Sequence, residues 1–265
     1  MQRSYDPLLT HTTRHLLLAI ACLTFAFLYL PIIVLALFSL SDSSLLAFPI
    51  ESFGLTWYRE LFADDDLWRS VRNSLIVAGS VVPLTLLLGV PLAFGMDRLR
   101  FPGKAWLEYG VLLPLVVPGI VTGLALLLLL KQFEVQLSLV TVAIGHSVWC
   151  LPIVVTQVYA RLRRFDRSIE EASLDLGASP VVTFCRVTLP NLKSALIGSA
   201  LLVFVLSFDE VPVTFFLTGS ENTLPMHIWS MLREGVTPVI NAIATLTIAL
   251  SILILALGLR FLSRD

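Results

Sequence analysis

Charged residues are scarce in this sequence. Only 14% of the 265 residues are Asp, Glu, Lys or Arg, whereas 57% are hydrophobic and the mean hydropathy is +0.88. Soluble globular domains are about one quarter charged, so this composition effectively excludes a soluble enzyme. The formal net charge of -1 leaves no basic excess that would neutralise phosphates, and we expect no binding to nucleic acid.

Cysteine and the common catalytic motifs are also scarce or missing. The three cysteines, Cys22, Cys150 and Cys185, have no CxxC spacing and lie in or beside apolar stretches, where cysteine behaves as a small hydrophobe. We therefore predict no disulfide framework and no metal site. The sequence contains no HExxH, GxSxG or GxGD motif, which argues against an enzyme that works inside a membrane.

The apolar residues gather in uncharged blocks that are long enough to cross a membrane. About 20 helical residues cross ~30 Å of hydrocarbon, whereas a membrane barrel would show short alternating segments. We predict an all-α polytopic membrane protein in which residues 1–265 form a single transmembrane domain. Its six predicted spans are residues 16–40, 74–96, 109–130, 135–160, 194–218 and 235–259.

Lysine and arginine in the loops predict the orientation of these spans. If the N-terminus is cytoplasmic, thirteen basic residues lie inside: Arg3, Arg14, Arg98, Arg100, Lys104, Arg161, Arg163, Arg164, Arg167, Arg186, Lys193, Arg260 and Arg264. Five lie outside: Arg59, Arg69, Arg72, Lys131 and Arg233. We therefore expect both termini in the cytoplasm. Asp64, Asp65 and Asp66 then belong to the first outer loop, as a solvated acidic surface or as a cation site.

Proline and glycine inside the predicted spans indicate bent helices that pack closely, because neighbouring helices take up the backbone groups that a kink frees. Pro118 is one such residue. Gly119 and Gly123 lie four residues apart on one helix face, which favours a contact surface made of small residues.

The longest inside loop, residues 161–193, contains signals for two short helices. Ser168 begins a capping box, in which its hydroxyl binds a free amide while Glu171 reaches back to the amide of Ser168. The first helix should end at Gly177, which supplies the left-handed backbone conformation of a C-terminal cap.

A second helix is predicted directly after the first. Ser179-Pro180 offers an N-cap followed by proline at the first helical position, and Leu189-Pro190 should end this helix. The apolar faces of both helices must be buried, either against the inner ends of the spans or against another protein.

The same loop resembles the EAA loop of bacterial ABC importer permeases. Glu171-Ala172-Ser173 is followed by three residues, Gly177, nine further residues and Val187-Thr188-Leu189-Pro190, as in that family. Ser173 replaces the second alanine, one small residue for another. The resemblance implies that this loop docks on an ATPase subunit through Glu171, Ala172, Ser173, Gly177, Leu189 and Pro190.

Further motifs resemble the spermidine/putrescine group of these permeases. They are Tyr29-Leu30-Pro31, Trp57-Tyr58, Arg98-Leu99-Arg100-Phe101-Pro102-Gly103-Lys104, Cys150-Leu151-Pro152 and Ser207-Phe208-Asp209-Glu210. The resemblance implies the ABC type I importer permease fold, with six transmembrane helices and a cytoplasmic two-helix coupling loop. It also implies a multi-pass protein of the bacterial inner (plasma) membrane.

The resemblance implies several partners. They are a second permease subunit, identical or different, two cytoplasmic ATPase subunits, and a periplasmic or extracellular solute-binding protein. The sequence has no GxxxxGK[ST] phosphate loop, so we expect ATP and Mg to be bound by the ATPase chain. This chain is then a transport subunit and not an enzyme, with no cofactor of its own.

Asp209 and Glu210 are the acids that are flanked on both sides by apolar sequence long enough to span a membrane. Asp209 lies fifteen residues beyond Ser194, which is about 22 Å at helical rise and places the pair in the outer half of the membrane. A charge near the centre of a membrane costs roughly 2.5 to 3.5 kcal/mol, so such acids should face a cavity, a partner or water. We predict that they line a passage for a cation together with Ser207. Alternatively, the fifth span ends early and the pair lies at the interface.

Two other residues have a structural and a functional interpretation. Trp57 is the kind of amphipathic residue expected at a membrane interface. The resemblance further implies that Trp57 lies at the outer entrance of the substrate pathway. His146 lies within the fourth predicted span, where a histidine is a proton relay or, more commonly, is hydrogen-bonded between helices.

The predicted function is that of a permease subunit forming half of a translocation pathway for a small cationic solute, with polyamines (spermidine/putrescine) as the first choice. One feature counts against polyamines: Pro118 is followed by Gly119, where spermidine/putrescine members tend to carry an acid. The alternatives are a permease for another solute, such as an opine or amino-acid derivative, iron or an oxyanion. A secondary transporter that uses Asp209 and Glu210 to couple protons is a further alternative.

Overall fold

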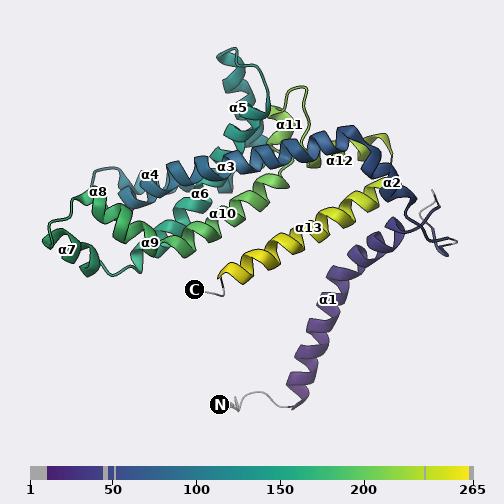
Figure 1. Cartoon of the computed structure of the whole chain (residues 1–265), viewed down its shortest axis with the longest axis horizontal. Coiled ribbons are helices and arrows are strands. Elements are labelled where there is room, and N and C mark those ends of the chain that lie inside the picture. Colours follow the sequence, from purple (N-terminus) through teal and green to yellow (C-terminus); the bar gives the residue numbers. More distant parts are fainter. Residues whose placement is uncertain (1–10, 44–46, 51, 236, 263–265) are drawn as a thin grey trace. The chain divides into compact units, whose positions relative to one another are not determined.

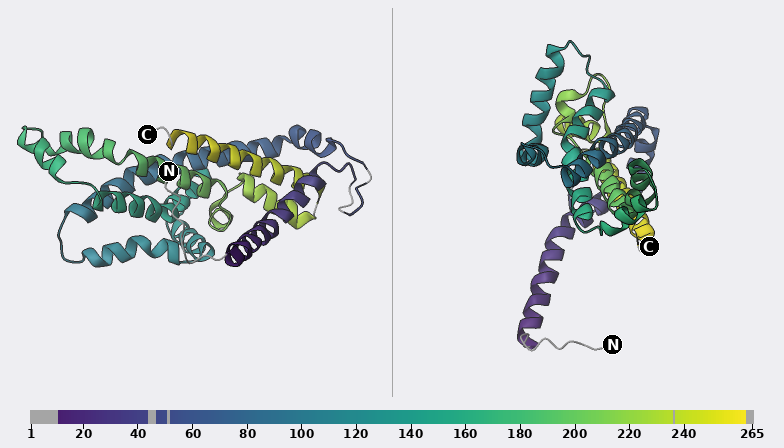
Figure 2. Two further views of the ribbon diagram at one scale, coloured as in Figure 1. Left: turned by 90° about the horizontal axis from the view of Figure 1, so that it is seen from below. Right: turned by 90° about the vertical axis from the view of Figure 1, so that its left-hand side faces the viewer.

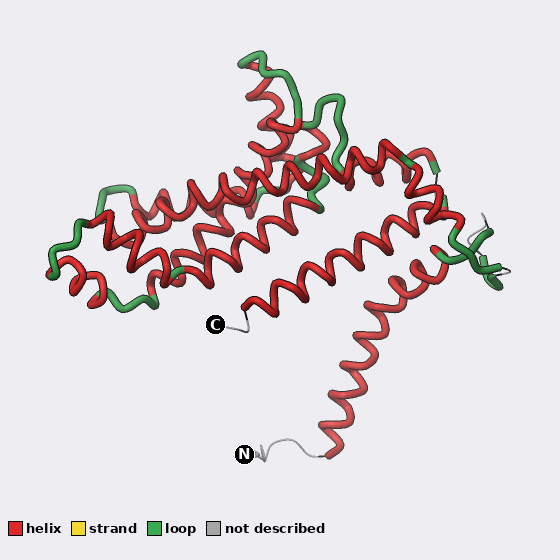
Figure 3. The backbone as a smooth tube through the Cα atoms, in the orientation of Figure 1, coloured by secondary structure: helices red, strands yellow, loops and turns green. Residues whose placement is uncertain are grey.

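The computed structural model describes residues 11–43, 47–50, 52–235 and 237–262, and only the backbone of residues 11–12 and 254–262. Within these residues all regular structure is helical, apart from one isolated bridge between Ser41 and Phe53 (Figure 3). This confirms the predicted all-α class. Arg3 and Arg264, two of the residues used to predict the orientation, lie outside the described residues.

The described residues form two compact units. The first unit contains the described residues up to Asp64 together with Met231–Leu253. Its helices are α1 (His11–Ser39), α2 (Thr56–Ala63), the end of α12 (Leu224–Glu234) and most of α13 (Pro238–Leu262). The apolar side chains along α1 are largely exposed, Phe27 by 79%. A long apolar helix of this kind requires lipid or another protein around it.

The second unit is built around three long helices that pack side by side (Figures 1 and 2). They are α3 (Asp65–Arg98), α6 (Leu139–Arg163) and α10 (Lys193–Phe208). Their contact is filled by fully buried valines, among them Val77, Val81, Val154, Val158 and Val203.

Glycine allows α3 and α6 to approach closely at one position. A Cβ atom on Gly89 would lie 2.8 Å from Cγ1 of Val154, closer than real Cβ contacts. A larger residue at position 89 would therefore push these two helices apart.

The third predicted span, residues 109–130, is not one helix. Its residues belong to α4 (Lys104–Val116) and α5 (Gly119–Gln132), which are bent by 107° at the break, and Figure 1 shows α5 leaving the α3–α6–α10 bundle. Val117 is extended, with φ −75° and ψ 128°. Proline disfavours the helical conformation of the residue before it and lacks an amide hydrogen, so Pro118 explains the break.

The fifth predicted span, residues 194–218, is also interrupted. Helix α10 ends at Phe208, and a short helix, α11 (Thr214–Leu217), follows after a gap that contains Pro212. This gap packs against the start of α5. A Cβ on Gly123 would lie 3.2 Å from the Pro212 carbonyl oxygen, and one on Gly119 would lie 3.0 Å from Pro212 Cβ. The predicted small-residue contact surface is thereby confirmed.

Among the residues that the structure describes, three helical segments are long and apolar enough to cross a membrane: Thr13–Ser39, Asp65–Arg98 and Leu139–Arg163. The number rises to five if each of two bent pairs counts as one span, namely α4 with α5 and Pro180–Asn191 with α10. The described apolar part of α13, Pro238–Leu253, is shorter. The exact number of six spans and the single-domain organisation stay predictions.

Candidate functional site

The loop at residues 161–193 folds into short helices at one end of the second unit, at the far end from α11 and α12 (Figure 1). They are α7 (Ser168–Asp175), α8 (Pro180–Thr183), the π-helix η1 (Phe184–Thr188) and α9 (Leu189–Asn191). Gly177 has φ +87°, the left-handed conformation predicted for it. Ser179 accepts a hydrogen bond from the amide of Val182, as predicted for an N-cap.

The predicted capping box is wrong. Ser168 is the first helical residue of α7, and Arg167 occupies the N-cap position without a side-chain hydrogen bond. The amide of Ser168 donates to Oδ1 of Asp166 at 3.0 Å, so an aspartate takes the place assigned to Glu171. This hydrogen bond lowers the pKa of the Asp166 carboxyl below its ordinary value. Glu171 is exposed.

The predicted end of the second helix at Leu189-Pro190 is wrong as well. The helical path continues through η1 and α9 to Asn191, and the chain bends by 68° before α10. Proline lacks an amide hydrogen and clashes with the carbonyl four residues earlier in an α-helix. The wider π-turn before Pro190 gives the backbone a way to continue past it.

An ion-pair network fastens this loop to the end of α3. Nη2 of Arg98 lies 2.6 Å from Oε2 of Glu170, and the Thr188 hydroxyl donates to Oε1 of the same carboxylate. Asp97 lies 3.0 Å from Arg98 and 2.9 Å from Arg167. The Arg98 and Glu170 side chains are each only 14% exposed. The sequence did not predict this pair, because Arg98 and Glu170 are 72 positions apart and no local pattern connects them.

The predicted docking residues lie on the outside of the loop. Leu176 is 89% exposed and Val181 is 71% exposed, so the second unit leaves these two apolar side chains uncovered, whereas Phe184 and Leu189 pack against its core. Ser173 is half-buried, and its hydroxyl lies 3.0 Å from that of Thr183. Of the other predicted residues, Leu189 is half-buried and four are exposed: Glu171, Ala172, Gly177 and Pro190. A surface of this kind is suited to receive another protein.

The predicted acidic pair is divided by the break between α10 and α11. Glu210 is buried, and its carboxylate accepts hydrogen bonds from the amides of Val213 at 2.7 Å and Thr214 at 2.9 Å. Its Oε2 also lies 3.1 Å from Nε2 of His146. Glu210 therefore satisfies the free amides at the start of α11.

His146 joins three helical elements. Its Nδ1 lies 2.8 Å from Oγ of Ser207 on α10, and its Nε2 lies 2.7 Å from Oγ1 of Thr214 on α11. The predicted hydrogen-bonded histidine between helices is confirmed. Ser207 and Glu210, which are three residues apart, both contact this imidazole.

Asp209 has the opposite environment. It is the C-cap of α10, its side chain is exposed, and its carboxylate has no hydrogen bond or ion pair within the described part of the chain. The C-terminal end of a helix disfavours a negative charge, and α10 has no basic residue in its last turn. An acid in this position is a natural place for a cation to bind.

Trp57 lies on α2 in the first unit. It is half-buried, and its indole N–H donates to the carbonyl of Ser41. The described residues contain no group of three or more His, Cys, Asp or Glu side chains that could hold a metal ion.

These features define a class of protein: a helical membrane subunit with an exposed docking loop at one end of its bundle and an exposed acid at a broken helix. Residues 85–264 match the family of binding-protein-dependent transport system inner membrane components, and the chain belongs to this family. It is a multi-pass permease subunit of an ABC transporter, and it is not an enzyme.

Relatives with similar sequences cover most of the chain. The putrescine transport system permease protein PotI of Escherichia coli (strain K12) is 37% identical over 237 residues, 86% of this chain and 84% of the relative. The spermidine/putrescine transport system permease protein PotC of the same organism is 35% identical over 242 residues, 91% of each chain. PotC of Haemophilus influenzae is 33% identical over 235 residues, 88% of this chain and 91% of the relative.

Solved structures share the fold. A bacterial ABC transporter that imports the acidic polysaccharide alginate superimposes with a TM-score of 0.75 at 17% sequence identity, covering 97% of this chain and 99% of that one. The MetNI methionine ABC transporter gives a TM-score of 0.64 at 18% identity, covering 75% and 95%. The ABC importer permease fold predicted from the sequence is confirmed.

Proposed function

We propose that this chain forms half of the translocation pathway for a polyamine, putrescine or spermidine, in an ATP-driven importer of the bacterial inner membrane. The observation that carries this proposal is the identity of 37% and 35% with permeases named for these two solutes, over 86% and 91% of the chain. The exposed Asp209 supports it, because an ammonium group and a carboxylate form charge-assisted hydrogen bonds.

The rest of the importer follows from the same proposal. A second permease subunit completes the pathway, two ATPase subunits bind ATP and Mg, and a solute-binding protein delivers the polyamine from outside. The apolar residues Leu176 and Val181 and the acid Glu171 form an exposed surface at the loop, where an ATPase subunit would dock. This loop and both termini then lie in the cytoplasm.

Uptake by the assembled importer tests the function. The chain is co-expressed with its partner permease, ATPase and binding protein in cells that lack other polyamine importers, and uptake of labelled putrescine and spermidine is measured with and without ATP depletion. We expect ATP-dependent uptake of at least one polyamine. Uptake that survives loss of the ATPase would instead indicate a secondary transporter. ATP-dependent uptake of an opine, iron or an oxyanion, without polyamine uptake, would overturn the proposed substrate.

A further inference from the structure

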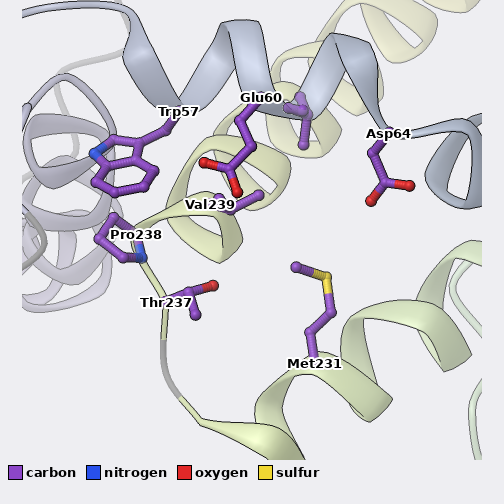
Figure 4. Close-up of a pocket in the computed structure, with 8 residues that line it drawn as sticks. Trp57, Glu60, Asp64, Met231, Thr237, Pro238 and Val239 are labelled. Atoms are coloured by element: carbon purple, nitrogen blue, oxygen red, sulfur yellow. The ribbon is translucent and has the colours of Figure 1, made fainter.

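The first unit contains a pocket of about 370 Å³ that the function described above does not use. One wall is a single face of α2, and the other is formed by the end of α12 and the start of α13 (Figure 4). The lining residues are Trp57, Glu60, Leu61, Asp64, Met231, Thr237, Pro238 and Val239. The volume falls within the range of natural small-molecule sites.

Helix α2 is held in place by contacts with the end of α1 and the loop that follows it. The indole N–H of Trp57 donates to the Ser41 carbonyl, and the Tyr58 hydroxyl lies 2.7 Å from Oγ of Ser39 at the end of α1. The amide of Gly54, just before α2, donates to the Leu40 carbonyl at 2.8 Å. The side chains of α2 are therefore presented by a helix that is already ordered, which lowers the entropic cost of binding.

The pocket combines two carboxylates, an aromatic ring and an apolar floor. Glu60 lies on α2, and Asp64 is the C-cap of this helix, four residues further along, so their Cβ atoms lie about 6 Å apart. Figure 4 shows Trp57 and Glu60 pointing from α2 toward Pro238 and Val239. None of the eight lining residues is basic.

We propose that this pocket is a binding site for a linear aliphatic polyamine. One ammonium group lies at Glu60, within reach of the Trp57 ring, and a second lies at Asp64. The alkyl chain between them contacts Leu61, Met231 and Val239. Carboxylates bind ammonium groups through charge-assisted hydrogen bonds, and an aromatic face attracts a cation. A short diaminoalkane matches the separation of the two acids, whereas a single ammonium group engages only one of them.

This site rests on the proposed function and deepens it. Under the proposed orientation α2 belongs to the outer loop, so the pocket lies on the side of the membrane from which the polyamine arrives. Trp57 is thereby given a specific role at the outer entrance, and Glu60 and Asp64 become specificity residues that sequence reasoning did not single out.

Binding to the purified importer tests the site independently of transport. The complete importer, without its binding protein, is placed in lipid nanodiscs, and the Kd of labelled spermidine is measured by equilibrium dialysis. Glu60→Gln and Asp64→Asn should each raise Kd several-fold, and the double variant should raise it at least tenfold. Asp65→Asn is the matched control, because it removes a charge from the same acidic run without changing the pocket. Butylamine, with one ammonium group, should compete weakly.

Two results would overturn the site. One is an unchanged Kd in the double variant, and the other is an equal rise in Kd with Asp65→Asn, which would indicate general electrostatic attraction. Basal ATP hydrolysis by each variant importer verifies that it is assembled. Failure of the proposed function gives a different result: the wild-type importer would transport no polyamine in cells, and the site would fall with it.

Discussion

Asp209 and Glu210 are neighbours in the sequence but have different surroundings. Glu210 accepts hydrogen bonds from two backbone amides and contacts His146, so its carboxylate is already bound by groups of the same chain. Asp209 is exposed at the end of α10, where the helix dipole opposes its charge. Of the two, Asp209 is the residue suited to meet a cationic solute, whereas Glu210 is suited to hold the broken helix together.

This difference predicts separate effects for two conservative substitutions. Asp209→Asn should lower polyamine uptake about tenfold or more at normal membrane levels, because a charge-assisted contact contributes roughly 1.5 to 3 kcal/mol. Glu210→Gln should mainly lower the thermal stability of the purified importer, because it weakens the contacts with Val213, Thr214 and His146.

Uptake per amount of membrane protein and the melting temperature of the purified importer are the two measurements. His146→Gln is the matched variant for Glu210→Gln and should also lower the melting temperature. Wild-type uptake in Asp209→Asn would place Asp209 outside the pathway. An unchanged melting temperature in Glu210→Gln, together with reduced uptake, would instead support the prediction from the sequence that Glu210 lines the pathway.

At the scale of elements, the coupling loop is attached to α3 through Glu170 and Arg98. The neighbouring Glu171 has no part in capping α7, because Asp166 binds the amide that Glu171 was predicted to bind. The two adjacent glutamates therefore differ in their contacts. Glu170 contacts Arg98 of the bundle, whereas Glu171 is exposed, as the proposed contact with an ATPase subunit requires.

Limited proteolysis distinguishes these roles. Glu170→Gln removes a charge-assisted contact worth roughly 1.5 to 3 kcal/mol, so the loop should open more often and trypsin should cut it several times faster. Glu171→Gln should leave the cutting rate unchanged but reduce ATP-driven uptake and retention of the ATPase in detergent. Equal cutting rates in both variants would show that the Glu170–Arg98 contact does not hold the loop. Normal uptake in Glu171→Gln would exclude a charge-dependent contact.

The sequence predicted only some of the local features of this loop: the caps at Gly177 and Ser179 are confirmed, whereas the capping box at Ser168 and the helix end at Leu189-Pro190 are wrong. Gly177 and Ser179 act over two or three positions, and both have the predicted roles. The Glu170–Arg98 contact depends on α3 lying beside the loop, which one sequence does not reveal. An early end of the fifth span was only the alternative prediction, because hydropathy continues across the break after Phe208 and the stabilising partner of Glu210, His146, comes from a helix that is distant in the sequence.

At the scale of the whole molecule, the helices of the second unit constrain the topology. Helix α3 has 34 residues, which is about 51 Å at helical rise and exceeds the ~30 Å of membrane hydrocarbon. Arg98, at its C-terminal end, contacts Glu170 of the coupling loop. In the N-terminal third of α3, Ser74 accepts a hydrogen bond from the amide of Leu224. Asp65 and Glu221 are thus expected on one side of the membrane and Ser168 on the other.

Cysteine labelling in sealed cells tests this arrangement. Cys22 and Cys185 are exposed and are replaced by serine, whereas Cys150 is buried and is kept. Single cysteines are then placed at the exposed positions 65, 221 and 168. A membrane-impermeant maleimide should label positions 65 and 221 in intact cells, and position 168 only after the membrane is opened. Labelling of all three positions from outside would contradict a transmembrane α3. Labelling of position 168 alone would invert the orientation, place the coupling loop outside and remove the basis for docking an ATPase there.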